Sequence, residues 1–256
     1  MRRALVLCYH AISDRWPADL AVSTKNFERQ LRMLIRRGYR GATFSDAVLA
    51  PAFEKTIAIT FDDGYASVRD RALPILSELG LPATVFVPTT FVGLDGPMSW
   101  TGIDQWVGGA FEAELMPMSW DDLRSLVAKG WEIGSHTCTH PHLTRLDDNA
   151  LRTELRRSRA HCEECIGVEC RSVAFPYGDS DERVVRAAAE AQYAAAATLP
   201  RRFHTWQPLA WPRVGVYRND SRLAFRAKIS PAVTLLRGTR LWERGIGLRP
   251  TGNGRR

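Results

Sequence analysis

Short apolar runs alternate with amphipathic stretches along the chain. The runs have the length of buried strands and lie at 5–9, 56–61, 83–87, 131–134, 172–175 and 194–198, with a weaker one at 209–214. Between them, apolar residues recur at helical spacing, as Phe27, Leu31 and Leu34 do. Helices are expected at 23–38, 66–79, 120–129, 147–165, 181–191 and 220–229. Such alternation predicts parallel strands with helices outside them, in a barrel or an open sheet.

One long segment interrupts this alternation. Residues 88–118 are punctuated by Gly and Pro and carry Trp100, Trp106 and Phe111. Long loops in compact domains are usually functional, so we expect this insertion to contribute to a site. The chain has 256 residues, a length that one α/β domain commonly reaches.

Residues that could take part in catalysis or binding follow the ends of the predicted strands. They are His10, the pair Asp62 and Asp63, His136, and the pair Pro176 and Tyr177. Because the carboxyl ends of parallel strands face the same side of the fold, we expect all of them to face one pocket.

His136 and His140 are four residues apart, so on a helical turn they lie on one face within reach of a single Zn, Co, Ni or Fe ion. Such a pair is also common in ordinary packing. Asp62 and Asp63 precede Gly64 directly after an apolar strand, where buried carboxylates need a cation or hydrogen bonds. A turn that caps the next helix is the simpler alternative.

The chain contains three motifs, Thr60-Phe61-Asp62-Asp63-Gly64, Ser135-His136-Thr137-Cys138-Thr139-His140-Pro141 and Phe175-Pro176-Tyr177-Gly178. In this order and spacing they resemble the motifs of the polysaccharide deacetylases, carbohydrate esterase family 4 with its NodB-homology domain. The resemblance spans about residues 4–215. It implies a distorted (β/α) barrel with about seven repeats, fewer than the eight of a complete barrel.

The resemblance also implies roles for individual residues. Asp62 would be the catalytic base. Asp63, His136 and His140 would bind a divalent metal and leave a coordination position for water. Zinc is the favoured ion, and Co2+, Ni2+ and Fe2+ are the alternatives. The backbone N–H of Tyr177 would stabilise the oxyanion, with Pro176 beside it in the substrate site.

Two departures from the family pattern leave roles to be filled. The usual late Leu-x-His motif is missing, because the last histidine is His204. His10 is the candidate general acid. Its setting, Tyr9-His10, is similar to the opening of a subgroup of the family that includes exopolysaccharide deacetylases. The alternative is a histidine that caps the strand end through hydrogen bonds.

The second departure concerns the partner of the base. The family often has Arg two residues before Pro176, where this chain has Ala174. Arg213 could supply that charge from the next wall of the pocket, or form a surface salt bridge instead. Trp211 could line the acetyl pocket or pack in the core.

The five cysteines indicate reduced thiols rather than a disulfide framework, because their number is odd and no secretory signal precedes them. Cys162 and Cys165, with His161 and Cys170 nearby, could bind a structural zinc. Incidental thiols at the end of a charged helix are the favoured interpretation.

The positive charge is concentrated at the C-terminus. The net charge is +7; residues 218–256 hold ten basic and two acidic residues, so the remainder is close to neutral. We therefore divide the chain into a catalytic domain, 1–217, and a basic helix and tail, 218–256. The tail could contact an anionic membrane or be an ordinary solvated end, and no nucleic-acid partner is expected.

Together these patterns predict a metal-dependent N-deacetylase acting on an N-acetylhexosamine in a glycan or lipid-linked oligosaccharide. Without an apolar run of about 20 residues, we expect a cytoplasmic protein, peripheral to the inner membrane face if the tail binds there. A metal-dependent amidohydrolase of small amides or imides, and a non-catalytic glycan-binding protein, are the alternatives.

Overall fold

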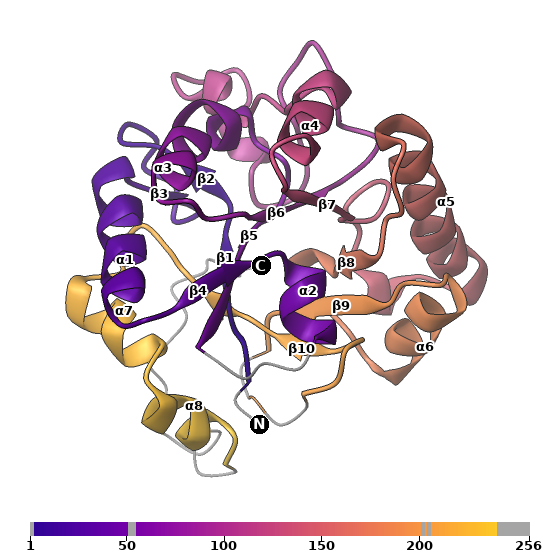
Figure 1. The fold of residues 1–256 in the computed structure, drawn as a ribbon. Helices are drawn as coiled ribbons and strands as arrows, with labels where there is room; N and C mark the ends of the chain where they lie inside the picture. Colours follow the sequence, from indigo (N-terminus) through magenta and orange to yellow (C-terminus); the bar gives the residue numbers. More distant parts are fainter. Residues whose placement is uncertain (1–2, 51–54, 201–202, 204–205, 240–256) are drawn as a thin grey trace.

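The computed structural model describes residues 3–50, 55–200, 203 and 206–239 (Figure 1). The strands are β1 (Leu5–Tyr9), β2 (Ala11–Ile12), β3 (Ala21–Val22), β4 (Arg40–Ala42), β5 (Thr56–Phe61), β6 (Thr84–Val87), β7 (Glu132–Ser135), β8 (Ser172–Ala174), β9 (Ala195–Thr198), β10 (Trp211–Pro212) and β11 (Val214–Gly215). The helices are α1 (Thr24–Arg36), α2 (Phe44–Leu49), α3 (Leu73–Glu78), α4 (Trp120–Val127), α5 (Asp148–Ile166), α6 (Glu182–Glu190), α7 (Arg222–Lys228) and α8 (Pro231–Arg237).

The parallel strands form a barrel that one short segment closes. The hydrogen-bonded order is β10-β9-β8-β7-β6-β5-β1-β11, with β4 added beside β5. β10 and β11 belong to the same stretch, 211–215, which pairs with β9 through Trp211 and with β1 through Val214. Counted once, this stretch gives seven positions around the barrel. The predicted distorted (β/α) barrel is therefore confirmed.

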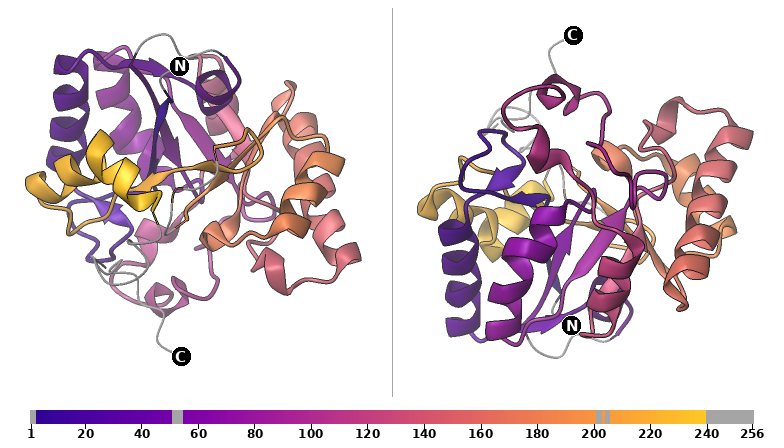
Figure 2. Two further views of the ribbon diagram at one scale, coloured as in Figure 1. Left: turned by 90° about the horizontal axis from the view of Figure 1, so that it is seen from below. Right: turned by 90° about the horizontal axis from the view of Figure 1, so that it is seen from above.

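Helices cover the barrel from outside because one stripe of each is apolar (Figures 1 and 2). In α1 the Ser23 hydroxyl accepts a hydrogen bond from the Asn26 N–H and caps the helix. Phe27 and Leu31 are fully buried, and the Phe27 ring meets Tyr9 of β1 edge to face at 5.1 Å. The apolar stripe of α1 and the buried strands thus pack into the main core of the barrel.

Helix α2 covers the end of the barrel where the strands begin (Figure 1). The Phe44 N–H donates to the Thr84 hydroxyl of β6 at 2.8 Å. The Glu132 carboxylate of β7 accepts hydrogen bonds from Ser45, Thr84 and, at 2.6 Å, Ser172 of β8. Hydroxyls from several elements satisfy this carboxylate, so a polar network closes this end of the barrel.

Several short elements differ from the sequence expectation. The helix expected at 66–79 is divided into a π-helical turn, Val68–Ala72, and α3. The strand expected at 209–214 is shorter and is interrupted at Arg213, where the chain changes partner strands. β4, α2 and α8 were not predicted, because elements of three to seven residues carry too little periodicity to detect.

The insertion 88–118 forms a lobe at the end of the barrel where the strands finish (Figure 2). It has its own apolar cluster, in which Met98, Ile103 and Leu115 pack with Trp16 and Tyr65. The insertion is therefore a folded wall beside the strand ends, which is the position expected of a functional loop.

The first part of the C-terminal region packs on the barrel. Phe225 of α7 and Ile229 are buried members of the main core. The rest of the region, 240–256, lies outside the described residues, as does His204, so the boundary at 217 stays a prediction. In the described part of the chain, no helix is long and apolar enough to cross a membrane.

Gly134 provides a test of the packing inside the barrel. A Cβ at this position would lie 2.5 Å from the Phe86 ring and 2.7 Å from the Ser172 hydroxyl. We expect Gly134→Ala to lower the free energy of unfolding by about 1–3 kcal/mol, measured by urea denaturation, because the core is overpacked. Gly96→Ala, whose Cβ meets no atom within 4 Å, is the control and should change stability little.

Candidate active site

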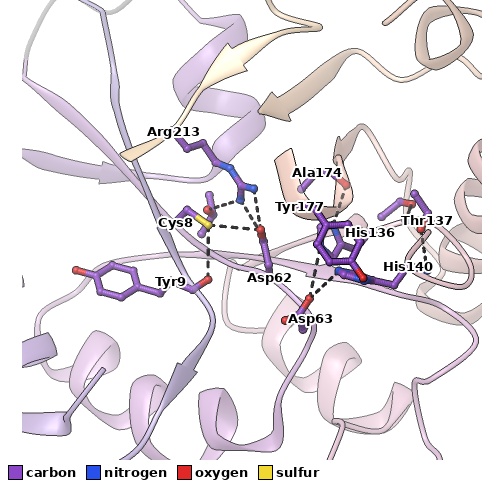
Figure 3. A network of polar contacts seen from close by, with 12 residues as sticks. Cys8, Tyr9, Asp62, Asp63, His136, Thr137, His140, Ala174, Tyr177 and Arg213 are labelled. Atoms are coloured by element: carbon purple, nitrogen blue, oxygen red, sulfur yellow. Dashed lines mark hydrogen bonds and ion pairs between the residues drawn. The ribbon is translucent and has the colours of Figure 1, made fainter. Parts of the chain in front are cut away.

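Two adjacent groups of side chains lie where the strands end (Figure 3). In the first, Asp62 meets Arg213 and Cys8; in the second, Asp63 meets His136 and His140. They come from the ends of β1, β5 and β7 and from the barrel-closing stretch. The candidates that follow different strands are thus brought together at one end of the barrel.

The second group fits a metal ion. The Nε2 atoms of His136 and His140 lie 3.4 and 3.5 Å from Asp63 Oδ1. Ligand atoms of all three residues lie within 4.8 Å of one another, and all three residues are buried. Asp63 Oδ1 is buried without a hydrogen-bond donor. A carboxylate and two imidazoles converging around such an oxygen are a ligand set suited to a divalent transition metal.

The two histidines differ in their surroundings. His136 places Nδ1 at 2.7 Å from the Ala174 carbonyl, an orientation typical of ligating histidines, with Nε2 directed at Asp63. Burial lowers its pKa, but the carboxylates of Asp62 and Asp63 outweigh burial and raise it. Burial lowers the pKa of His140 to about 3, which keeps its ring neutral as a ligand requires.

The backbone is strained around this group. Non-glycine residues with positive φ include Asp63 (72°), Thr137 (68°), His140 (60°) and Tyr177 (59°), all in the motifs of the site. Left-handed backbone costs about 1–3 kcal/mol at such residues and persists only where the surroundings enforce it. This concentration of strain indicates that the fold is organised around these side chains.

Asp62 is held by a buried two-point ion pair. Arg213 Nη1 donates to Asp62 Oδ1 at 2.6 Å and to the Thr60 hydroxyl at 3.0 Å, while Nη2 donates to Oδ2 at 2.7 Å. Burial would raise the pKa of Asp62, but Arg213 and then His136 outweigh it and hold this pKa far below its usual value. Asp62 is therefore ionised and fixed in orientation.

Arg213 takes the place left by Ala174 at the third motif. Its side chain is 1% exposed, so the alternative of a surface salt bridge is excluded. Ala174 instead contributes its carbonyl to His136.

Cys8 and His10 complete the surroundings of Asp62. The Cys8 thiol donates to Asp62 Oδ2 at 3.4 Å, and ligand atoms of Cys8, His10 and Asp62 lie within 4.8 Å of one another. Because Arg213 already engages both oxygens of Asp62, we interpret this group as an ion pair with an adjacent thiol and histidine rather than a second metal site. Cys8 was missed, although it precedes His10 by two residues and shares its face of the chain.

The third motif places Tyr177 beside the histidines. Its ring is 42% exposed and lies edge to face with His140 at 4.7 Å. Pro176 is buried and begins a single 3-10 turn, in which the Tyr177 N–H is one of the first donors and has no acceptor within the turn.

Trp211 lies in a different environment from the other predicted site residues. It belongs to an apolar cluster with Phe86 and Ala174 and meets Trp206 at 5.4 Å. Trp211 lies two residues before Arg213, so its side chain points to the same side of the chain. It is one layer closer to the end of the barrel where the strands begin. These are the surroundings of core packing, and a contact with the acetyl group stays a prediction.

The cysteines near His161 do not form a comparable site. Cys162 and Cys170 are buried free thiols and Cys165 is half-buried. Among the residues that the structure describes, they are not part of any group of three possible metal ligands within 4.8 Å. This agrees with the favoured interpretation of incidental thiols.

Comparison with known families decides which class of protein carries this site. The family model described as polysaccharide deacetylase matches residues 50–196. The chain belongs to the polysaccharide deacetylase family. The matched region contains the two aspartates, both histidines and the third motif, whereas His10 and Arg213 lie outside it.

Individual members of the polysaccharide deacetylase family support this assignment. A chitooligosaccharide deacetylase of Bradyrhizobium sp. (strain ANU 289) is 30% identical over 184 residues, covering 71% of this chain and 69% of that protein. YxkH of Bacillus subtilis (strain 168) is 26% identical over 198 residues, covering 75% of this chain but only 63% of YxkH. The crystal structure of BA0330 from Bacillus anthracis superposes with a TM-score of 0.74 at 26% identity, covering 90% of this chain and 69% of that one. The predicted hydrolase class is thereby confirmed at the level of the family.

The buried ion pair of this deacetylase-family site can be tested by removing one partner. We expect Arg213→Met to lower the free energy of unfolding by about 3–5 kcal/mol, because Asp62 is left as an uncompensated buried charge. Arg213→Lys keeps the charge without the two-point contact and should lose less. Urea denaturation measures both effects.

The double variant Asp62→Asn/Arg213→Met is the control for this pair. It removes both charges and should recover part of the stability lost by Arg213→Met. Equal stability of Arg213→Met and the wild type would contradict the structural role given to the pair.

Proposed function

We propose that the protein removes the acetyl group from an N-acetylhexosamine in a glycan or a lipid-linked oligosaccharide, with a divalent metal as cofactor and zinc as the favoured ion. The observation that carries this proposal is the convergence, in one place, of Asp63, His136 and His140 with the ionised and immobilised Asp62 beside them. Asp62 is held by Arg213 rather than by the candidate ligands, and an ionised carboxylate held beside a ligand set in this way is suited to act as a general base.

Asp63, His136 and His140 would hold the metal, which when bound polarises the acetamide carbonyl and acidifies a water molecule. Asp62 accepts the proton of the attacking water. Oδ2 accepts from both Arg213 and Cys8, whereas Oδ1 accepts from Arg213 and keeps a second lone pair for the proton. Because Asp62 is ionised and cannot rotate away from Arg213, it is prepared to accept a proton without prior rearrangement.

Two other residues would complete the reaction. The Tyr177 N–H donates to the oxyanion of the tetrahedral intermediate. His10, within 4.8 Å of Asp62, gives a proton to the leaving nitrogen, so that acetate and a free amine are released. In this arrangement base and acid come from the ends of neighbouring strands, β5 and β1.

Asp62→Asn tests the base. It should lower the rate of acetate release by about 10²–10⁴-fold because no proton acceptor remains, while metal content measured by elemental analysis stays unchanged. His136→Ala should lose both activity and metal. His161→Ala, an exposed histidine on α5, is the matched control and should retain both. Full activity of Asp62→Asn would exclude this mechanism.

The role of His10 can be separated from metal binding. His10→Gln should slow hydrolysis of an N-acetylated sugar by about 10²–10⁴-fold, with metal content unchanged. An aryl acetate, whose leaving group departs without a proton, should be affected far less. The measurement is the ratio of the two rates in the variant and the wild type, and an equal loss on both substrates would contradict the role of His10 as the acid.

Substrate class is tested by acetate release from a panel. N-acetylglucosamine oligomers and a lipid-linked N-acetylated sugar are compared with small amides and cyclic imides, in the presence of Zn2+ or Co2+. Release from the sugars supports the proposal, whereas hydrolysis of the small amides alone supports the amidohydrolase alternative. Failure to bind metal and to hydrolyse any compound supports the glycan-binding alternative.

Location and membrane contact stay predictions. The basic region after residue 217 would bring the enzyme to an anionic membrane surface, where a lipid-linked oligosaccharide is available. Sedimentation of the full chain with anionic and neutral vesicles tests this independently of activity.

A further inference from the structure

Trp100, in the insertion 88–118, lies against the candidate ligand His140. The two rings stack with centroids 4.3 Å apart and an interplanar angle of 25°. Trp100 also meets Phe91 edge to face at 5.0 Å. Phe91 belongs to the same insertion, so Trp100 contacts both this ring and His140. No motif of the family placed Trp100 in the site.

His140 lacks the hydrogen bond that its partner ligand has. His136 Nδ1 lies 2.7 Å from the Ala174 carbonyl, whereas His140 Nδ1 is buried and meets no hydrogen-bonding group among the described residues. A ligating histidine almost always donates its second N–H to an oxygen, which fixes the plane of the ring. Among the described residues, ring contacts rather than a hydrogen bond therefore orient His140.

Aromatic rings surround His140, where His136 has a hydrogen bond. Besides the stack on Trp100, the His140 ring meets the edges of Tyr177 at 4.7 Å and His136 at 4.9 Å. The Tyr177 hydroxyl donates to the Thr101 carbonyl at 3.2 Å, next to Trp100. The insertion thus holds both the stacked ring and one of the edge-on rings, and a ring packed in this way cannot turn freely.

We propose that Trp100 is the positioning residue for the metal ligand His140 and takes over the orienting role of the missing hydrogen bond. Stacking sets the plane of the imidazole and keeps its Nε2 directed at Asp63 Oδ1, 3.5 Å away. The inference rests on the metal site of the proposed function. It assigns to the insertion a part in building that site, in addition to forming its wall.

The chain contains its own control for this proposal. The tetrapeptide Pro-Met-Ser-Trp occurs twice, at 97–100 and at 117–120. The second copy ends in Trp120, a half-buried residue that begins α4 and meets His161 at 5.1 Å rather than any candidate ligand. Trp100→Ala and Trp120→Ala therefore remove the same side chain from the same local sequence.

The experiment measures metal affinity rather than activity. Metal-free full-length protein competes with a chromophoric chelator for Zn2+ and Co2+. We expect Trp100→Ala to weaken binding about 10–100-fold, the loss typical of an outer-shell partner. Trp100→Phe, which keeps a stacking ring, should bind nearly as the wild type does, and Trp120→Ala should bind unchanged. Urea denaturation of the metal-free variants separates lost stability from lost affinity.

The outcomes distinguish this inference from the proposed function. Wild-type affinity in Trp100→Ala overturns the role of Trp100 and leaves the metal site intact. Absence of metal binding by the wild type overturns both. If Trp100→Ala does not fold, Trp100→Leu and Trp100→Phe decide: weaker binding by the leucine variant alone supports the stacking role, and equal binding by the two overturns it.

Discussion

The ion pair between Asp62 and Arg213 joins the closure of the barrel to the chemistry of the site. Arg213 lies at the point where stretch 211–215 changes its pairing from β9 to β1, so the residue that completes the barrel also holds the carboxylate at the end of β5. An ionised buried carboxylate needs a cation or hydrogen-bond donors to compensate for its lost hydration, and for Asp62 the main compensation is Arg213. Because Arg213 reaches Asp62 from the closing stretch, the backbone geometry of closure also fixes the direction of the Asp62 carboxylate.

Asp62 and Asp63 are neighbours in sequence yet have separate partners. The left-handed backbone at Asp63, with φ of 72°, turns its carboxylate away from Arg213 and toward His136 and His140. The strained conformation thus keeps the arginine-bound carboxylate and the carboxylate that faces the two histidines apart within two residues. Gly64 also has positive φ and continues the same tight turn. A Cβ at this position would lie 3.0 Å from Val87 Cγ1, so the turn also passes close to β6.

The sequence was sufficient to predict the residues that follow strand ends, because strand periodicity and parallel topology together determine where such residues gather. Asp62, Asp63, His136 and Tyr177 were identified in this way. The contact of Arg213 with Asp62 could be suggested but not decided from the sequence. The strand predicted at 209–214 contains Pro212, so the direction of the Arg213 side chain could not be predicted. Trp100 could not be predicted, because the path of a long insertion depends on packing against distant residues such as Trp16 and Tyr65. For Trp211 the sequence left the acetyl pocket and core packing as alternatives, because a short strand does not reveal which layer a side chain occupies.

The departure at Ala174 has a physical explanation in the geometry of a closed barrel. Side chains from all strands converge on the interior, so the charge that holds Asp62 can come from β8 or from the stretch that follows β9. Arg213 already contacts both oxygens of Asp62, and a second guanidinium from position 174 would add an unpaired buried charge beside it. A small residue at 174 avoids this conflict, and the backbone carbonyl of the same residue orients His136. In this chain the arginine that pairs with Asp62 therefore comes from position 213 rather than from position 174.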